Sequence, residues 1–272
     1  MRVSLLLATA FALPATTAAA EPVASADVPE VDPASFAVAS PYRISSAARA
    51  GKIRYRLSFS PPIAWVWPET GEQRVRTESG DTVLTICEDC GREPAPSEDE
   101  LQRYRRANAW VNSDDRGVRA FALTTGGGSV DRRMRKLVAA VRSRMTGAIE
   151  YDDYQTASQA LRSHAGDCTE AAVLLAAAAR ARGIPARVVA GLAYASRFVG
   201  KPHAFGPHMW VQAWDGRRWT SYDAGLGAFD AGHIALAVGD GAPDGFSRTM
   251  AAISRLRIDR AESVIDDDMP SP

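Results

Sequence analysis

The sequence has no excess of charge of either sign, few cysteines and histidines, and no long apolar run beyond its first residues. Its 272 residues include 32 Lys and Arg against 32 Asp and Glu, so the formal net charge of 0 does not favour a nucleic-acid or strongly acidic partner. Two short basic runs, 103–106 and 132–136, lie beside acidic residues in helix-like segments, which indicates solvated faces. A content of 46% hydrophobic and 24% charged residues is ordinary for a globular protein, in one large domain or two modest ones.

The first 20 residues have the pattern of a signal peptide. A positive charge at Arg2 is followed by the apolar run Val3–Pro14 and the small residues Ala18–Ala20, and the run is too short to cross a bilayer comfortably. We therefore expect residues 1–20 to be a signal peptide of a periplasmic or secreted protein, with no integral membrane segment after its removal. Residues 21–40 are rich in Ala, Pro, Val and Ser without a period, which predicts a mobile leader.

Residues 41–96 have the patterns of short strands. Between Ile53 and Phe59, apolar residues alternate with charged or polar ones, which predicts a strand with one buried face. We expect a small antiparallel β-rich unit that serves packing or positioning. Further short strands are expected at 64–67, 72–77 and 82–86, with a turn at 78–81.

Only three cysteines are present, and two of them form a Cys-x-x-Cys pair, Cys87 and Cys90. The pair follows an all-β stretch and has no second pair elsewhere, which argues against both a thioredoxin-type site and a zinc site. In an exported protein the plainest expectation is a local disulfide, and Cys168 is then a candidate reactive thiol. A redox function of Cys87 and Cys90 stays open as an alternative.

Cys168 stands at the start of a predicted helix. Residues 171–181 are dominated by Ala and Leu, while Gly183 and Pro185 end the helix. A thiol at a helix N-terminus lies near unpaired backbone N–H groups, which lower its pKa and favour the thiolate. A buried structural cysteine is the alternative.

Other helices and strands are expected on both sides of Cys168. Ser97 and Asp115 are candidate caps of two helices, and the glycine-rich segment 126–129 is a loop rather than a phosphate site, because no Gly-Lys-Ser/Thr follows it. The predicted helices are 97–110, 113–123, 131–145 and 158–163, and the predicted strands are 186–194, 209–214, 217–222 and 255–261, with an irregular loop at 196–206.

A histidine and an aspartate flank the hairpin after Cys168. Asp215-Gly216 suits a tight turn, so antiparallel pairing brings His208, at the start of one strand, to the same end of the sheet as Asp223. A thiolate nucleophile needs an imidazole to carry its proton, and the imidazole needs a carboxylate to orient it. Among the four histidines, His203 is the fallback base and His233 is expected to be a structural hydrogen-bonding residue.

This order of cysteine helix, histidine strand and aspartate strand resembles the transglutaminase-like superfamily. The resemblance implies an α+β fold of papain-like type, in which the cysteine helix packs on an antiparallel sheet. It gives a catalytic domain at 97–245, after the β-rich region 41–96 and before a C-terminal strand and disordered tail at 246–272. The matching segments are Gly166–Cys168, Arg182–Val189, Gly191, His208–Trp210 and Trp219–Asp223.

The resemblance also implies a Cys168–His208–Asp223 triad that cleaves an amide or peptide bond through an acyl-thioester, with no cofactor or metal. The backbone N–H of Cys168 would be one oxyanion donor, and Tyr151 and Gln155 are candidates for the second. Because the chain lacks the extra domains and calcium-binding segments of large animal transglutaminases, hydrolysis of a peptide, protein or small amide is expected rather than cross-linking. A non-catalytic peptide- or glycan-binding module on the same fold is the alternative.

Overall fold

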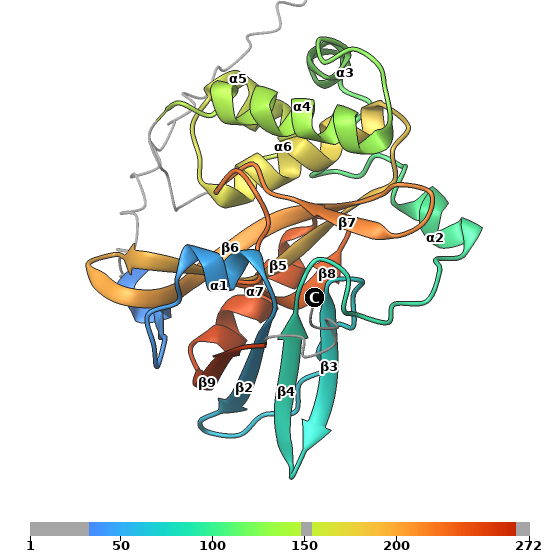
Figure 1. Cartoon of the computed structure of the whole chain (residues 1–272). Helices are drawn as coiled ribbons and strands as arrows, with labels where there is room; N and C mark the ends of the chain where they lie inside the picture. Colours follow the sequence, from blue (N-terminus) through green and yellow to red (C-terminus); the bar gives the residue numbers. More distant parts are fainter. Residues whose placement is uncertain (1–32, 148–153, 265–272) are drawn as a thin grey trace, which may run out of the picture. The chain divides into compact units, whose positions relative to one another are not determined.

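Two antiparallel sheets and a group of helices build the part of the chain that the structure, a computed structural model, describes, residues 33–147 and 154–264 (Figure 1). The predicted signal peptide lies outside these residues. The strands are β1 (Val38–Ala39), β2 (Ile53–Phe59), β3 (Gln73–Glu78), β4 (Asp81–Ile86), β5 (Ala186–Phe198), β6 (Lys201–Trp214), β7 (Trp219–Tyr222), β8 (His233–Gly239) and β9 (Leu256–Ser263). The helices are α1 (Ser46–Ala50), α2 (Glu98–Arg103), α3 (Arg116–Leu123), α4 (Val130–Arg144), α5 (Ala157–Ser163), α6 (Cys168–Ala181) and α7 (Pro243–Ile253), with a 3₁₀ turn η1 (Pro33–Phe36).

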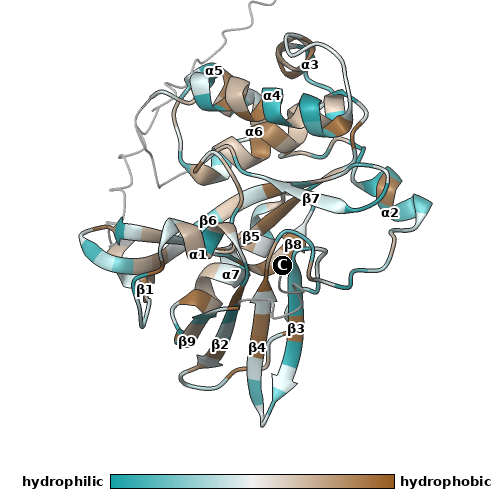
Figure 2. Cartoon of the chain, viewed as in Figure 1, coloured by the Kyte–Doolittle hydropathy of each residue, from teal (hydrophilic) through white to brown (hydrophobic). Residues whose placement is uncertain are grey.

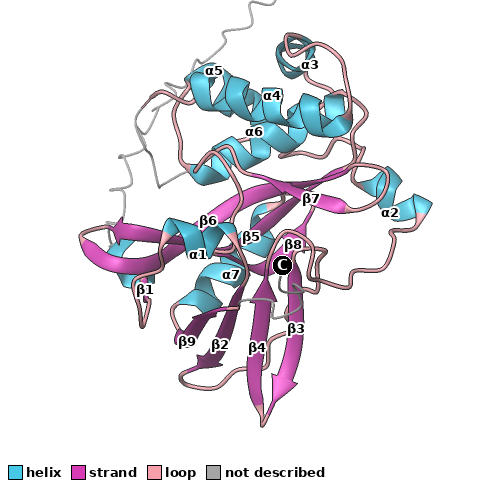
Figure 3. Cartoon of the chain, in the orientation of Figure 1, coloured by secondary structure: helices cyan, strands magenta, loops and turns pink. Residues whose placement is uncertain are grey.

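The first sheet has the order β1-β6-β5-β8, with β7 paired to the other part of β6 (Figure 3). β5 and β6 form one long hairpin, so the irregular loop predicted at 196–206 is wrong. Val199 and Gly200 make the turn, both with positive φ, and the strands pair on either side of it. Pairing along the whole hairpin outweighs the local effect of Pro202, which is unfavourable inside a strand.

α6 is the central helix of the molecule. Its residues from Thr169 to Arg180 are all buried, because one side packs on β5 and β6 and the other on α3, α4 and α5. Figure 2 shows that α6 is mostly apolar, whereas the neighbouring α4 has mixed polarity. α4 buries Met134, Leu137, Val138 and Val141. The α+β arrangement of a cysteine helix on an antiparallel sheet is therefore confirmed.

The second sheet has the order β3-β4-β2-β9 and buries Ile53, Tyr55 and Leu57 of β2, as the alternation predicts. β9 from the C-terminal region pairs with β2, so strands from the first and last parts of the described chain share this sheet. No strand forms at 64–67. Trp67 in that segment instead stacks on Phe59, with ring centroids 5.8 Å apart.

Several boundaries differ from those that the sequence predicts. Residues 33–39, assigned to a mobile leader, form η1 and β1, and β1 pairs with β6. The helix expected at 97–110 ends at Arg103, and α7 has no counterpart among the predicted helices. No helix within 33–147 or 154–264 is both long and apolar enough to cross a membrane.

Candidate active site

Cys168 is the first residue of α6, as predicted, and the local sequence determines where this helix begins. Asp167 is the N-cap: its Oδ1 accepts the backbone N–H of Thr169 at 2.7 Å, and Glu170 Oε2 accepts the backbone N–H of Asp167 at 2.9 Å. Gly166 has a φ of +129°, and a Cβ there would lie 2.6 Å from Glu170 Cγ. The turn before the cysteine therefore requires glycine.

The electrostatics around Cys168 differ from the expectation of a lowered pKa. Burial raises the pKa of the thiol well above its ordinary value, and the charge of Asp167 raises it further. A hydrogen bond with the Met209 backbone lowers it, while Asp223 and Glu170 add to the increase. The carboxylates that cap the helix thus place negative charge beside the sulfur, so the resting protein favours the neutral thiol.

His208 and Asp223 form a direct contact. His208 Nε2 lies 2.8 Å from Asp223 Oδ2, and both side chains are buried. The other carboxylate oxygen accepts the backbone N–H groups of Gly225 at 2.7 Å and Leu226 at 3.1 Å. Burial by itself would raise the pKa of Asp223, but hydrogen bonds from His208 and His233 outweigh it and hold the pKa well below its ordinary value. Asp223 is therefore an ionised carboxylate that can orient an imidazole and stabilise its charge.

The place of His208 in its strand differs from the prediction. β6 begins at Lys201, so His208 lies in the middle of the strand rather than at its start. β7 ends at Tyr222. On the side of β6 that faces away from β5, β1 pairs with β6 before His208 and β7 pairs with it after His208, and neither strand pairs with His208 itself. Among the described residues, His208 thus has no strand partner on the side of β6 that faces away from β5.

The three candidate residues meet at Gly225. A Cβ at this position would lie 2.9 Å from His208 Cε1, 3.3 Å from Asp223 Oδ1 and 3.3 Å from Cys168 Cβ. Because these atoms surround one point, the structure brings Cys168, His208 and Asp223 together, although they come from three separate elements. Only glycine leaves room for this arrangement.

Arg142 of α4 holds the segment that follows Asp223. Its Nη1 donates to the carbonyl oxygen of Gly225 at 2.9 Å and lies 3.4 Å from that of Ala224. Leu226, the next residue, is 55% exposed. The segment therefore presents an apolar side chain to solvent beside the candidate triad.

A second histidine, His233, contacts the same carboxylate. Its Nε2 lies 3.1 Å from Asp223 Oδ2, and its Nδ1 lies 3.3 Å from Asp230 Oδ1. Burial by itself would lower the pKa of His233, but the two carboxylates raise it to about 9. The structural role expected from the sequence did not include this contact with Asp223. Three aromatic rings surround His233, with centroids at 5.5, 5.2 and 5.0 Å: His208, Trp210 and Phe229.

These groups also bear on the question of a metal. Within the described residues, His208, Asp223 and His233 offer ligand atoms that lie within 4.8 Å of one another. Hydrogen bonds of 2.8 and 3.1 Å from the two imidazoles to Asp223 Oδ2 account for this spacing. The donor set therefore fits a proton-sharing cluster, in which Nε2 of His208 and both nitrogens of His233 already face oxygen acceptors.

The other candidates from the sequence have different surroundings. His203 Nδ1 lies 3.1 Å from the Tyr194 hydroxyl, and His164 is the C-cap of α5. Tyr151, a candidate oxyanion donor, lies outside the described residues. Gln155 Oε1 accepts a hydrogen bond from Ser163 Oγ at 2.9 Å, so its side chain is held in the turn before Cys168.

A buried carboxylate from the N-terminal region, Glu72, supports β6 and β7 beside the candidate site. It accepts the backbone N–H of Ser221 at 2.8 Å, the Gln212 amide at 3.0 Å and the Ser221 hydroxyl. Trp210 Nε1 donates to Ser221 Oγ at 3.1 Å, and the Trp210 ring stacks with that of His208, with centroids 6.2 Å apart. The sequence offered no signal for this network because Glu72 and Ser221 are 149 residues apart.

Cys87 and Cys90 are free thiols, so the predicted local disulfide is not formed. Cys90 Sγ lies 3.5 Å from the carbonyl oxygen of Thr85. Burial raises the pKa of Cys90 well above its ordinary value, and a hydrogen bond with Cys87 contributes to the increase. A thiolate at Cys90 is therefore disfavoured, which weakens the redox alternative.

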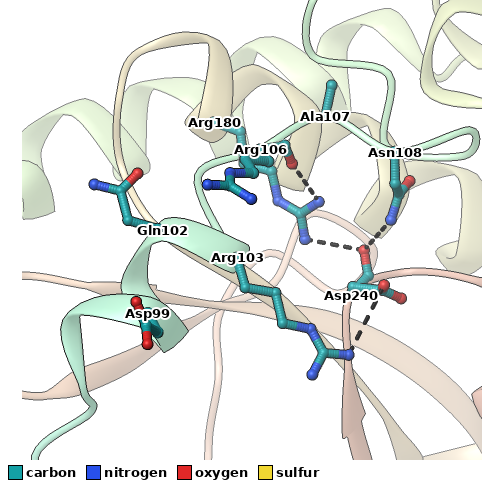
Figure 4. Close-up of a pocket in the computed structure, with 8 residues that line it drawn as sticks. All are labelled: Asp99, Gln102, Arg103, Arg106, Ala107, Asn108, Arg180 and Asp240. Carbon is teal, nitrogen blue, oxygen red and sulfur yellow. Dashed lines mark hydrogen bonds and ion pairs between the residues drawn. The ribbon is translucent and has the colours of Figure 1, made fainter.

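A cavity of about 390 Å³ lies at the opposite end of α6, about 18 Å from Cys168 along the helix axis at 1.5 Å per residue (Figure 4). The buried guanidinium of Arg180 lines it and donates to the carbonyl oxygens of Arg106 at 3.1 Å and Asp240 at 2.9 Å. Asn108 donates to the same Asp240 carbonyl at 3.1 Å. These bonds tie the end of α6 to the chain segments around it, which is a structural role.

The region that holds the three candidates matches a known family. Residues 119–224 match the model of the transglutaminase-like superfamily. A comparison with curated proteins finds no match.

Three solved structures resemble the chain. A candidate cysteine protease from Cytophaga hutchinsonii is 17% identical over 80% of this chain and 84% of its own, with a TM-score of 0.42. The periplasmic domain of TgpA from Pseudomonas aeruginosa is 20% identical over 70% of this chain and 75% of its own, with a TM-score of 0.45. Red sea bream transglutaminase is 12% identical over 65% of this chain and 47% of its own, with a TM-score of 0.37. Because these scores are below 0.5, the likeness rests on the match to the family model: the segment 119–224, which carries Cys168, His208 and Asp223, is similar to the transglutaminase-like superfamily.

Proposed function

We propose that this protein is a cysteine-dependent acyl-transfer enzyme that acts on an amide or peptide bond, with Cys168 as nucleophile, His208 as base and Asp223 as the carboxylate that orients it. The observation that carries this proposal is the convergence of the three side chains on Gly225. The 2.8 Å contact supports the assigned roles, because it uses Nε2 of His208 for Asp223 and leaves Nδ1 as the nitrogen for the cysteine proton.

The reaction begins when Cys168 Sγ attacks the substrate carbonyl carbon while its proton moves to His208 Nδ1. The resulting oxyanion accepts a hydrogen bond from the backbone N–H of Cys168 at the start of α6. The tetrahedral intermediate collapses, the C–N bond breaks, and His208 gives its proton to the leaving amine. Water then attacks the thioester carbonyl while His208 takes a proton from it. The second tetrahedral intermediate collapses, the C–S bond breaks, and His208 returns the proton to Cys168 Sγ, which releases the acid and the free thiol.

A raised pKa of Cys168 determines when the thiolate forms. In the resting protein, burial and nearby carboxylates favour the neutral thiol. The proton therefore moves to His208 in concert with attack on the substrate, rather than before the substrate arrives. In this respect the mechanism differs from that of a preformed thiolate–imidazolium pair.

Hydrolysis is the proposed outcome, on a peptide, a protein or a small amide. The exposed Leu226 beside the triad would contact an apolar part of such a substrate. We further propose export to the periplasm or the medium, on the basis of the signal-peptide pattern at residues 1–20.

The test is to trap the acyl-enzyme. The mature chain is incubated with a set of N-acyl peptide amides, quenched in acid and analysed by peptide mass spectrometry. We expect an acyl mass on the Cys168 peptide that hydroxylamine removes, together with release of free acid. Cys168→Ala should show neither, and His208→Ala should form the adduct at least about 100-fold more slowly.

Transfer of the acyl group to an added primary amine in preference to water would assign transamidation instead of hydrolysis. No adduct with any substrate would favour the alternative, a non-catalytic peptide- or glycan-binding module. The raised pKa of Cys168 is the observation that favours this alternative, because the thiol of an unreactive buried cysteine also has a raised pKa.

A further inference from the structure

His233 is placed between two carboxylates. Its Nε2 faces Asp223 Oδ2 at 3.1 Å, and its Nδ1 faces Asp230 Oδ1 at 3.3 Å and the Asp230 carbonyl oxygen at 3.1 Å. Asp230 in turn forms an ion pair with Arg49 of α1. The side chain of His233 is 2% exposed, so water contributes little to its solvation.

The charge on His233 follows from these contacts. An imidazole can donate from both nitrogens only when it is protonated, and here each nitrogen faces at least one oxygen acceptor. The backbone N–H of Asp230 also lies 3.2 Å from Nδ1 and could donate to a neutral ring. The protonated form of His233 is favoured because Nδ1 faces two oxygen acceptors and one donor, and because two carboxylates lie nearby. This agrees with a pKa of His233 that is raised to about 9.

Four hydrogen bonds then hold the carboxylate of Asp223. Oδ1 accepts two backbone N–H groups, at 2.7 and 3.1 Å, and Oδ2 accepts from both His208 and His233. Rotation of the carboxylate would break these hydrogen bonds and leave buried donors unsatisfied. The position of Asp223, and through it that of the His208 ring, thus depends on His233.

We propose that His233 is a positioning residue of the active site, which as an imidazolium clamped between Asp223 and Asp230 fixes the triad carboxylate and neutralises part of its charge. This inference rests on the proposed function, because it assigns a role within the same triad. His208 consequently faces a paired carboxylate instead of an isolated one.

Partial neutralisation has a consequence for the reaction. An isolated carboxylate 2.8 Å away would strongly favour protonated His208, whereas the cation of His233, with its ring centroid 5.5 Å from that of His208, opposes a second positive charge. The charge of Asp223 is therefore balanced in part by His233 before a substrate binds. The same balance agrees with a neutral thiol at Cys168 in the resting protein.

The charged groups around His233 come from four directions. Asp223 follows β7, Asp230 precedes β8, His208 lies on β6 and Arg49 belongs to α1. The hydroxyl of Tyr55 on β2 donates to the carbonyl oxygen of Ala231 at 2.8 Å, close to this cluster. Titration of His233 must be interpreted with all of these groups present.

The experiment is an NMR titration of the histidine rings in the full mature chain, in wild type and in His233→Gln. Only four histidines are present, so ¹³C- and ¹⁵N-labelled rings can be assigned by substitution. Gln retains a hydrogen-bond donor toward Asp223 but removes the charge. We expect wild-type His233 to stay protonated to about pH 9, and the midpoint of His208 to rise in His233→Gln by about one pH unit, a tenfold change in proton affinity.

The matched control is His203→Gln, which alters a histidine in contact with Tyr194 and should leave the His208 midpoint unchanged. A residue with a merely structural role would lower stability without raising that midpoint. If folded His233→Gln leaves the His208 midpoint where it is, or if wild-type His233 titrates near 6.5 as an ordinary histidine does, the inference is wrong. If His233→Gln does not fold, the wild-type titration of His233 decides.

The titration needs no substrate, so it separates this inference from the proposed function. Absence of an acyl-enzyme together with the expected titration would overturn the proposed function and leave the charge pairing of Asp223 by His233 intact. Formation of an acyl-enzyme together with an ordinary His233 titration would do the reverse. His233→Gln should also move the acid limb of the pH profile of kcat/KM upward, in parallel with the NMR midpoint.

Discussion

Asp223 and Glu72 are two buried carboxylates on the same side of the first sheet, and their pKa values shift in opposite directions. Their exposures are 0% and 3%. Asp223 accepts hydrogen bonds from His208 and His233, which hold its pKa low against the effect of burial. Glu72 accepts hydrogen bonds from neutral groups such as Ser221, and burial raises its pKa. Burial therefore does not decide ionisation by itself, because a cationic partner can reverse its effect.

The difference separates a chemical role from a structural one. Asp223 holds a charge that an imidazole can use when it gains a proton. Glu72 provides hydrogen-bond acceptors that join the N-terminal region to β6 and β7. Loss of the charge should therefore abolish activity at Asp223 and leave the fold intact, whereas at Glu72 loss of the hydrogen bonds should affect the fold first.

Asp223→Asn should have the largest effect on activity. The substitution keeps the size of the side chain but removes the charge, and its amide can turn a donor toward the base, which favours the wrong tautomer of His208. We expect kcat/KM to fall about 10⁴-fold, with a far-UV circular dichroism spectrum like that of wild type.

Asp215→Asn is the matched control for this change. Asp215 accepts the backbone N–H groups of Arg217 and Arg218 in the turn between β6 and β7, and asparagine retains that acceptor. Its kcat/KM should stay within about twofold of wild type. A decrease of less than tenfold in Asp223→Asn would remove Asp223 from the triad.

Glu72→Ala should destabilise the protein by about 3 kcal/mol, because it leaves the buried donors of Ser221 and Gln212 without an acceptor. Glu72→Gln keeps one acceptor and should cost less than about 1 kcal/mol. Urea unfolding at pH 7 measures both. Glu88→Ala, at a side chain that is 89% exposed, is the control and should change stability by less than about 0.5 kcal/mol.

The pH dependence sharpens this comparison. Since the folded pKa of Glu72 is raised, the protonated form favours folding, and its contribution falls as the pH rises from 4.5 toward the folded pKa. Glu72→Gln should lack this part of the slope. Equal destabilisation by Gln and Ala would show that charge, and not hydrogen bonding, is what Glu72 contributes.

Much of the candidate site was predictable from local patterns. The start of α6 at Cys168 follows from helix propensity and capping, and the β6–β7 hairpin follows from alternation around Asp215. These signals span a few residues each. The contacts of His233 with Asp223 and of Glu72 with β6 and β7 were not predictable, because no local sequence pattern signals them.

The errors in the fold have the same cause. The segment 201–206 contains proline and glycine and was expected to be irregular, yet it pairs with β5 and, at Ala204 and Phe205, also with β1. A strand paired on both sides gains more from the partners than it loses through local propensity. The raised pKa of Cys168 also depends on Asp223, a distant residue, besides the helix start that the sequence shows.

Gly225→Ala tests how closely the triad is packed. The new methyl group would lie 2.9 Å from His208 Cε1, so the ring or the loop must move by a few tenths of an ångström. Because a misplacement of catalytic groups by about 1 Å costs up to about 100-fold, we expect this smaller shift to lower kcat/KM by about 10-fold with little change in KM. Gly245→Ala in α7, where a Cβ meets nothing within 4 Å, is the control and should be as active as wild type. Full activity in Gly225→Ala would mean that Cys168 and His208 do not depend on this contact.

The smallest expected effect is a loss of stability at alkaline pH that depends on His233. Its folded pKa of about 9 lies above the ordinary 6.5, so its contribution is fully present below pH 6.5 and is lost as the pH rises through about 9. We expect the free energy of unfolding to fall by on the order of 1 kcal/mol between pH 7 and pH 8.5.

Urea unfolding of wild type and His233→Gln across this pH range measures the decrease. Cys168 and Cys90 also weaken the fold as the pH rises, because their thiols ionise more readily in the unfolded chain, and they do so equally in both proteins. The difference between the two slopes therefore isolates the contribution of His233. Parallel slopes would mean that His233 is neutral beside Asp223. A cationic His233 would then no longer explain why Asp223, unlike Glu72, stays ionised.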